Sequence, residues 1–335
     1  MIKLRYLNSG LSVLIVLNLS ILLWRCVPDA PHSNPLDPFY KDSGEENFNI
    51  TGYIYHKNVT TLPVDSCLIL LTPGESYALS DAAGRFTFFN ITERNYQLFF
   101  SKTGYENHTL SILTDTLTSE PLFVYLNGFP KIRDISLSSQ FIDQWYPDPF
   151  FSVTVNLIAE DPNGPADIQE TWLQIPDLNM VKLFNRSSRT DSFHLRLPET
   201  EFPSEDIFSV IGKDIFIELT DESDARTVEG PFFIHRIIDT SPVPLSPIGL
   251  ATVGSQPVLE WQNYTANFYF EFDIQVFFIL AGVPTLIHTR TGIPSSELQY
   301  GYPNPLSPGQ YYWVVIVRDQ LGNISRSREA SFQVQ

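Results

Sequence analysis

The sequence predicts an all-β protein built from three tandem β-sandwiches. Apolar and polar side chains alternate along many short runs, for example 193–197 and 268–276. A period of two buries one face of a strand and leaves the other in water, as antiparallel sheets require. Turn-forming residues recur about every ten residues between these runs, and no long stretch after the N-terminal segment has helical spacing. These observations favour stacked sheets over a mixed fold.

Residues 1–25 have the pattern of an export signal. Lys3 and Arg5 precede a largely apolar run from Leu11 to Trp24, and Cys26 follows directly after this region. The apolar run is shorter than the ~20 residues that a permanent membrane-spanning helix needs. A basic start, a short apolar core and then a cysteine predict secretion across a membrane.

This layout resembles a bacterial lipoprotein signal, in which Leu23 takes the position three before the cysteine. The resemblance implies that Cys26 carries lipid and becomes the mature N-terminus. Trp24 and Arg25 stand where such signals have small residues, so a plain signal peptide or an uncleaved anchor is the alternative. We expect a cell-envelope location, with the choice of membrane and leaflet left open.

The segment 26–47 is expected to be a tether. Pro28, Pro31, Pro35 and Pro38 recur there among polar residues, with few apolar side chains to bury. Such segments stay extended and solvated.

Composition excludes some partners. The formal net charge is −17, so binding to nucleic acid is not expected, because that needs Lys and Arg against the phosphates. The same charge is repelled by anionic lipid headgroups, so a lipid on Cys26 is the better link to a membrane. The second cysteine of the chain, Cys67, lies in an apolar run and is expected to be a buried small hydrophobe.

The first unit, 48–127, carries seven expected strands. Its segments Thr51–Ile54, Asp81–Phe86 and Tyr96–Tyr105 resemble the carboxypeptidase regulatory-like domain, a small transthyretin-like sandwich. None of the six histidines is followed by Glu three residues later, so the resemblance does not imply peptidase activity. The strands are expected at Ile50–His56, Cys67–Thr72, Tyr77–Ser80, Arg85–Asn90, Tyr96–Lys102, Thr109–Leu113 and Leu122–Leu126.

The second unit, 128–239, contains Leu157–Gly164 followed by Asp167 and Ile168, which resembles a strand and turn of bacterial immunoglobulin-like domains. We expect a closing hairpin made by Lys213–Asp221 and Pro231–Ile238.

The third unit, 240–335, resembles a fibronectin type III domain in Pro257–Trp261 and Leu306–Trp313. Trp261 is expected to fill the core between its two sheets. The proline-rich segment Thr240–Pro247 is expected to be a stiff linker.

Acidic side chains form two groups of candidates. Asp161, Asn163 and Asp167, beside Glu160, offer oxygen ligands to calcium, but the EF-hand spacing is absent and a solvated turn is the simpler interpretation. We therefore expect no metal site and no cofactor. The second group is interpreted as polar loops at a sandwich end, because paired carboxylates hydrolyse glycosides only at a defined separation. Its members are Glu199, Glu201, Glu205, Asp206, Asp221, Glu222 and Asp224.

Trp145 and Tyr146 are the candidate ligand-binding residues. They lie in a loop interrupted by Pro147 and Pro149. Exposed rings on sandwich loops can stack on sugars or peptides, and the alternative is a plug between the first and second units, because exposed apolar patches are uncommon.

The sequence thus predicts a non-enzymatic, lipid-anchored protein of the bacterial cell envelope, acting as a structural, adhesive or scaffold module. The alternative is a carbohydrate- or peptide-binding accessory protein, and a hydrolase of unknown type is a further rival. The expected partners are a membrane, through the N-terminal lipid, and a protein or glycan ligand. No catalytic residue is identified.

Overall fold

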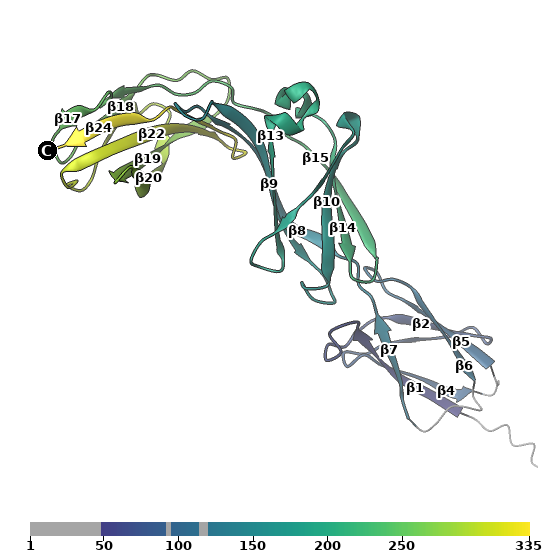
Figure 1. Ribbon diagram of the computed structural model, residues 1–335. Helices are drawn as coiled ribbons and strands as arrows, with labels where there is room; N and C mark the ends of the chain where they lie inside the picture. Colours follow the sequence, from purple (N-terminus) through teal and green to yellow (C-terminus); the bar gives the residue numbers. More distant parts are fainter. Residues whose placement is uncertain (1–47, 92–94, 114–119) are drawn as a thin grey trace, which may run out of the picture.

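The computed structural model describes residues 48–91, 95–113 and 120–335. The expected all-β fold is confirmed, since these residues form strands joined by turns and contain no α-helix. Three sandwiches follow one another in an elongated, bent arrangement, with the C-terminus at the far end from the first strand (Figure 1). The described residues include no helix long and apolar enough to cross a bilayer. The signal, the tether and Cys26 lie outside the described residues.

The first sandwich pairs a sheet of order β4-β1-β7 with a sheet of order β3-β2-β5-β6. Every strand expected here is confirmed to within two residues at either end. Cys67 is fully buried between the sheets, as its apolar run predicted, and Phe100 is fully buried there too. The strands are β1 (Phe48–His56), β2 (Leu68–Thr72), β3 (Ser76–Leu79), β4 (Arg85–Ile91), β5 (Asn95–Ser101), β6 (His108–Leu113) and β7 (Leu122–Leu126).

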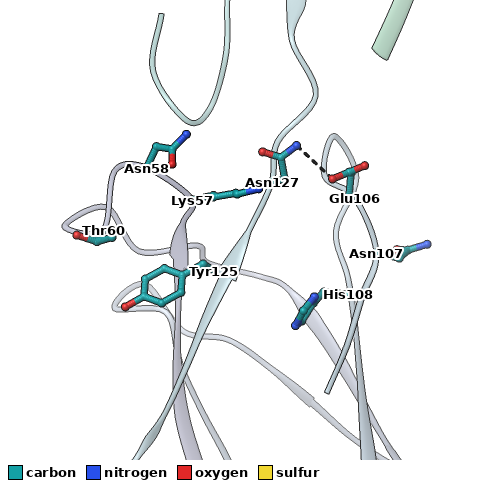
Figure 2. A pocket seen from close by; sticks show the side chains of 8 residues that line it. All are labelled: Lys57, Asn58, Thr60, Glu106, Asn107, His108, Tyr125 and Asn127. Carbon is teal, nitrogen blue, oxygen red and sulfur yellow. Dashed lines mark hydrogen bonds between the residues drawn. The ribbon is translucent and has the colours of Figure 1, made fainter. Parts of the chain in front are cut away.

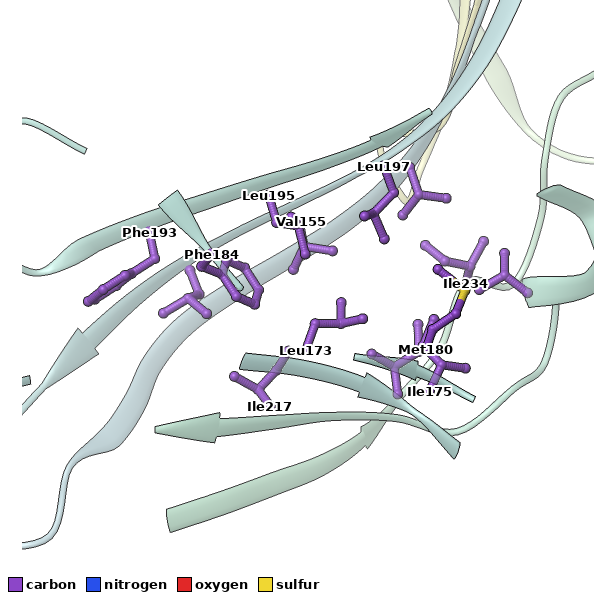
Figure 3. Close-up of a cluster of buried hydrophobic side chains, with 14 of the residues drawn as sticks. Val155, Leu173, Ile175, Met180, Phe184, Phe193, Leu195, Leu197, Ile217 and Ile234 are labelled. Carbon is purple, nitrogen blue, oxygen red and sulfur yellow. The ribbon is translucent and has the colours of Figure 1, made fainter. Parts of the chain in front are cut away.

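The second sandwich places β11-β10-β14-β15 over β12-β13-β9-β8. Val155, Leu173 and Ile217 are among the side chains that interlock between the two sheets (Figure 3). The strands are β8 (Lys131–Ile142), β9 (Phe150–Glu160), β10 (Ile168–Ile175), β11 (Met180–Leu183), β12 (Asn185–Arg186), β13 (Ser192–Pro198), β14 (Ile215–Asp221) and β15 (Arg226–Phe232). Short 3-10 turns lie at one end of this sandwich, namely η2 (Pro176–Leu178), η3 (Glu199–Glu201), η4 (Pro203–Glu205) and η5 (Ile207–Val210).

The expected closing hairpin of this sandwich is half right. β14 is where the alternation placed it, but its partner is Arg226–Phe232 and not Pro231–Ile238. No residue of β15 is fully buried, so this strand has no apolar alternation to reveal it. The apolar residues that follow, Ile234, Ile237 and Ile238, are buried outside the hairpin as the chain passes to the third sandwich.

The third sandwich has a small sheet of order β16-β18-β21 over a larger one. Trp261 is 1% exposed and its ring lies edge-on to Phe272, which confirms its predicted place in the core. The strands are β16 (Pro244–Ser246), β17 (Ala251–Val253), β18 (Val258–Trp261), β19 (Phe270–Leu280), β20 (Val283–Pro294), β21 (Gln299–Gly301), β22 (Gly309–Asp319), β23 (Ile324–Arg326) and β24 (Ala330–Val334).

The second and third sandwiches share one sheet. β23 pairs in parallel with the end of β8, with Ser325 opposite Phe141, so the order β12-β13-β9-β8-β23-β22-β19-β20 runs through both. The side chain of Asn323 accepts hydrogen bonds from the backbone N–H of Ser139 at 2.8 Å and from its hydroxyl at 3.0 Å. Backbone and side-chain hydrogen bonds therefore both cross this junction.

The first and second sandwiches meet at a close approach between Gly128 and Pro162. A Cβ atom on Gly128 would lie 2.5 Å from the Pro162 ring, which is closer than real atoms come. Beside it, Asn163 accepts a hydrogen bond from the Gly128 N–H at 2.6 Å and donates to the carbonyl of Lys57 at 2.6 Å. This junction consequently has no space for a side chain at position 128.

We predict that Gly128→Ala destabilises the protein through this junction. The added methyl group must push Pro162 aside, and overpacking of this kind costs about 1–3 kcal/mol. Urea unfolding measures the loss in free energy of unfolding. Gly301→Ala is the matched control, because a Cβ atom there meets nothing within 4 Å. Equal stability of the two variants would contradict the tight packing at Gly128.

Candidate functional site

Three buried carboxylates meet where the first and second sandwiches join. Asp161 follows β9, Asp167 precedes β10 and Asp221 ends β14, so the second sandwich supplies all three. One carboxylate oxygen from each residue lies within 4.8 Å of the corresponding oxygens of the other two. We call these three residues the junction triad.

Two of the triad residues, Asp161 and Asp221, use their Oδ1 atoms to hold local structure. Asp161 Oδ1 accepts a hydrogen bond from the N–H of Asn163 at 2.7 Å, which closes the turn after β9. Asp221 Oδ1 accepts from the N–H groups of Ser223 and Ala225, each at 2.8 Å, and so organises the β14–β15 turn. Carboxylates that bond to nearby backbone N–H groups are the ordinary way to build such turns. The Oδ2 atoms of Asp161 and Asp221 are not used in these turns.

The first sandwich and its exit supply carboxamides to the triad. Asn58 donates from Nδ2 to Asp167 Oδ1 at 2.6 Å. Asn127 donates from Nδ2 to Asp221 Oδ2 at 2.7 Å and to Glu106 Oε2 at 3.2 Å. Neither asparagine was identified from the sequence, because only the docking of two sandwiches brings these residues to the triad. Their one sequence signal is their position just beyond the ends of β1 and β7.

The solvated turn expected at Asp161, Asn163 and Asp167 is wrong. These side chains are only 8%, 3% and 3% exposed, because the first sandwich covers the turn. Asp221, expected in a polar loop, is fully buried at the same junction. Glu160, expected beside the cluster, instead pairs with Lys131 at 2.9 Å.

Several polar atoms of the cluster lack hydrogen-bond partners. Asp161 Oδ2, Asp167 Oδ2 and Asn127 Oδ1 are fully buried without a donor. In the described residues, six buried side-chain atoms have no partner, and these three acceptors are half of them. A buried polar group without a partner costs about 1–3 kcal/mol, so these acceptors would gain from a cation or a hydrogen-bond donor at the cluster.

A pocket of about 440 Å³ opens beside the triad, on the first sandwich. Figure 2 shows Lys57, Asn58 and Glu106 around it, with Asn127 at the end nearest the second sandwich. Lys57 is exposed and donates from Nζ to Ser223 Oγ at 2.6 Å. Asn58 and Asn127 line the pocket and also donate hydrogen bonds to the triad, so the pocket lies next to the carboxylates.

Burial, together with the charges of Asp167 and Asp221, raises the pKa of Asp161 to about 7 against the hydrogen bond from Asn163. Burial also raises the pKa of Asp167, although the hydrogen bond from Asn58 opposes this. Both shifts reflect the cost of holding negative charges together in a poorly solvated place.

Trp145 and Tyr146 lie at the other junction, between the second and third sandwiches. The alternative of a plug between the first and second units is therefore wrong. Trp145 and Tyr146 are 68% and 90% exposed, so neither ring fills a junction. Trp145 donates from Nε1 to the Glu329 carbonyl at 2.9 Å, and the Arg328 guanidinium lies 4.6 Å from its ring centre. Contacts to the third sandwich thus hold this ring in place.

Trp145 lines a groove of about 590 Å³. Asp143 and Arg328 form an ion pair at 2.8 Å beside it, and the exposed side chains of Val243 and Ile248 contribute apolar surface. An indole held by hydrogen bonds next to apolar and charged groups is a surface suited to binding a sugar or an extended peptide.

The remaining acidic candidates have structural contacts. Asp206 accepts a hydrogen bond from the N–H of Phe208 and caps η5, and Glu201 pairs with Lys182. Glu205, Glu222 and Asp224 are exposed and outside the triad. Among the described residues, the triad is the single group of three or more His, Cys, Asp or Glu side chains with metal-binding geometry.

Comparison with known proteins gives fold-level similarity alone. No family model matches the chain, and no curated protein matches it. The FN1–FN3 domains of chicken CNTN1 are similar at 9% identity, covering 82% of this chain and 92% of that one, with a TM-score of 0.34. The fibronectin(III)-like modules of Clostridium thermocellum CbhA give 11% identity, 62% and 93% coverage and a TM-score of 0.29. Dimeric latent PorU from Porphyromonas gingivalis gives 11% identity, 80% and 29% coverage and a TM-score of 0.23.

We predict that Asp161 makes the free energy of unfolding depend on pH when the buffer contains a chelator. A pKa raised from 3.8 to about 7 means that the folded state binds its proton more tightly than the unfolded chain. The stabilisation is present below about pH 4 and is lost as pH rises towards about 7, so this residue makes the free energy of unfolding fall over that range. Asp161→Asn removes the charge, so the variant is more stable than the wild type at neutral pH and similar to it under acid conditions.

Urea unfolding across this pH range measures the effect. Asp214→Asn is the control, because Asp214 is an exposed carboxylate just before β14, the strand that ends at Asp221. A pH slope that survives Asp161→Asn unchanged would contradict the assignment.

Proposed function

We propose that this protein is a lipid-anchored, non-enzymatic rod of the bacterial cell envelope that presents binding surfaces away from the membrane. The observation that carries the proposal is the sheet shared by the second and third sandwiches. Domains joined only by a flexible linker change orientation freely, whereas a shared backbone ladder fixes it. A presenting module benefits from this stiffness.

Ion pairs reinforce the shared sheet. Arg236, which lies between the second and third cores, pairs with the fully buried Asp319 at 3.0 Å. Asp143, after β8, pairs with Arg328 at 2.8 Å and accepts a hydrogen bond from Ser241 at 2.7 Å. Separating Arg236 from Asp319 leaves a buried carboxylate without its partner, which is costly, so bending at this junction is opposed by more than the β8–β23 ladder.

The tether and the lipid on Cys26 complete the proposal. The first sandwich begins directly after the segment 26–47, and the third sandwich lies at the opposite end of the arrangement (Figure 1). A proline-rich extended segment spaces a domain from its anchor. The Trp145 groove then lies one to two sandwiches away from the membrane.

The lipid anchor predicts that Cys26→Ser releases the protein from the membrane fraction. A single lipid chain gives marginal binding and several chains give stable binding. Fractionation and mass spectrometry of the mature N-terminus in the native bacterium measure the outcome. Cys67→Ala is the control, because this second cysteine is buried in the first core and should leave fractionation unchanged. An unmodified, membrane-bound Cys26→Ser protein would refute lipid anchoring, and the stiff rod would then need another anchor.

The second candidate function is recognition of a carbohydrate or peptide. The held indole of Trp145 and the 90% exposed ring of Tyr146 beside the groove favour it. Aromatic rings at a binding surface supply contact area at low entropic cost. This activity is compatible with a presenting rod, because the rod determines where the groove is displayed.

Recognition through the groove predicts that Trp145→Ala abolishes binding on glycan and peptide arrays. The control is Tyr77→Ala, which removes a 72% exposed ring from the first sandwich, far from the groove. Binding that survives Trp145→Ala, or that is lost equally in both variants, would rule out the groove as the recognition surface.

A further inference from the structure

We propose that the junction between the first and second sandwiches binds a calcium ion through Asp161, Asp167 and Asp221, with Asn127 as a fourth ligand. This inference is independent of the lipid anchor and of the Trp145 groove. It rests on the geometry of the triad, on its unpartnered oxygens and on the segments that carry them.

The triad has the spacing that one calcium ion requires. Calcium–oxygen distances are ~2.3–2.6 Å, so two oxygens that share an ion lie at most ~5 Å apart. The triad oxygens are within 4.8 Å of one another. A single ion can therefore contact all three carboxylates with the backbone as it stands.

The buried oxygen atoms without hydrogen-bond donors are a second observation that points to a cation. Asp161 Oδ2, Asp167 Oδ2 and Asn127 Oδ1 are all acceptors, and their residues are more than nine-tenths buried. A proton satisfies one of them, whereas a cation at the centre satisfies several at once. None of the ion pairs found among the described residues involves a triad carboxylate, so no side chain neutralises the cluster directly.

The carboxamide of Asn127 points into the triad. Its Nδ2 atom is 2.7 Å from Asp221 Oδ2, while its Oδ1 atom is buried without a donor. The oxygen and nitrogen of an amide have nearly the same shape, so a half-turn of the side chain exchanges them. With the ion bound, this exchange places Oδ1 where Nδ2 now donates to Asp221 and Glu106, so the ion replaces these two hydrogen bonds and the buried oxygen becomes a ligand.

The donor set favours calcium over other common ions. Zinc prefers nitrogen and sulfur ligands, which are absent from the triad. Magnesium usually keeps several waters and takes one or two carboxylates, whereas calcium accepts many protein oxygens in irregular geometry. Three carboxylates and a carboxamide from three separate segments, namely the β9–β10 loop, the end of β14 and the residue after β7, match calcium, and Asn127 also lines the pocket in Figure 2.

The ion would fasten the two sandwiches together. The triad belongs to the second sandwich, and Asn127 lies where the chain leaves the first. Asn58 holds Asp167 from the first sandwich as well. An ion bound to both sides opposes separation of the sandwiches, so binding stabilises the folded chain by mass action.

The test uses the full chain in detergent after removal of metals with a chelator. Calorimetric titration with calcium chloride should give one ion per chain with half-saturation at or below ~1 mM, and saturating calcium should raise the unfolding temperature. Asp161→Asn and Asp167→Asn should each weaken binding at least tenfold. The exposed Asp214→Asn variant should bind as the wild type does.

The variants are informative because they should remain folded. Removing one buried negative charge relieves repulsion, so Asp161→Asn without calcium should unfold at or above the wild-type temperature. Absence of binding at ~5 mM calcium, well above the range of weak extracellular sites, would overturn the proposal. Binding unaffected by either triad substitution would overturn it also, and equal affinity for magnesium would overturn the assignment of calcium.

Discussion

The open edge of β8 is the constraint on which the shape of the protein depends. This strand pairs with β9 along one edge, and its other edge carries backbone groups that need partners. An open edge invites pairing with other chains. Here β23 covers residues 140–142, and Asn323 satisfies both the N–H and the hydroxyl of Ser139. These hydrogen bonds fix the orientation of the third sandwich relative to the second. The stiffness of this half of the rod therefore follows from the need to pair the open edge of β8.

The junction between the first and second sandwiches is joined by different chemistry. The sheets of the two sandwiches are separate, and the contacts come from turns, from Gly128 against Pro162 and from asparagine side chains. Where the β8–β23 ladder is neutral and insensitive to its surroundings, this junction gathers three carboxylates away from water. Its energy therefore changes with protonation and with cations, because like charges repel strongly in a poorly solvated site. One junction is thus built mainly on a backbone ladder, and the other contains a carboxylate cluster whose repulsion depends on protonation.

The sequence predicted what depends on neighbours within one sandwich. Alternation located the seven strands of the first sandwich, and the tryptophan at position 261 marked the third core, because both reflect burial within a single unit. The sequence did not predict the burial of residues that a second sandwich covers. The Asp161 turn looks solvated until the first sandwich covers it, and Trp145 was assigned to the wrong junction because nothing local distinguishes the two. The second strand of the closing hairpin was predicted at the wrong residues, because β15 has no fully buried residue and so leaves no periodic pattern in the sequence.

Both candidate sites lie where two sandwiches meet, and this has a physical reason. A sandwich core is filled by its own side chains, and a lone sandwich end offers loops that water can solvate. Docking changes this, because it buries the carboxylates of Asp167, before β10, and Asp221, in β14, against amides of Asn58 and Asn127 and holds Trp145 against Arg328. Groups that are unremarkable on one unit become a desolvated cluster or a rigid aromatic surface when the second unit arrives. Both candidate sites are therefore properties of the junctions, and a sandwich separated from its neighbour would lose the contacts that form them.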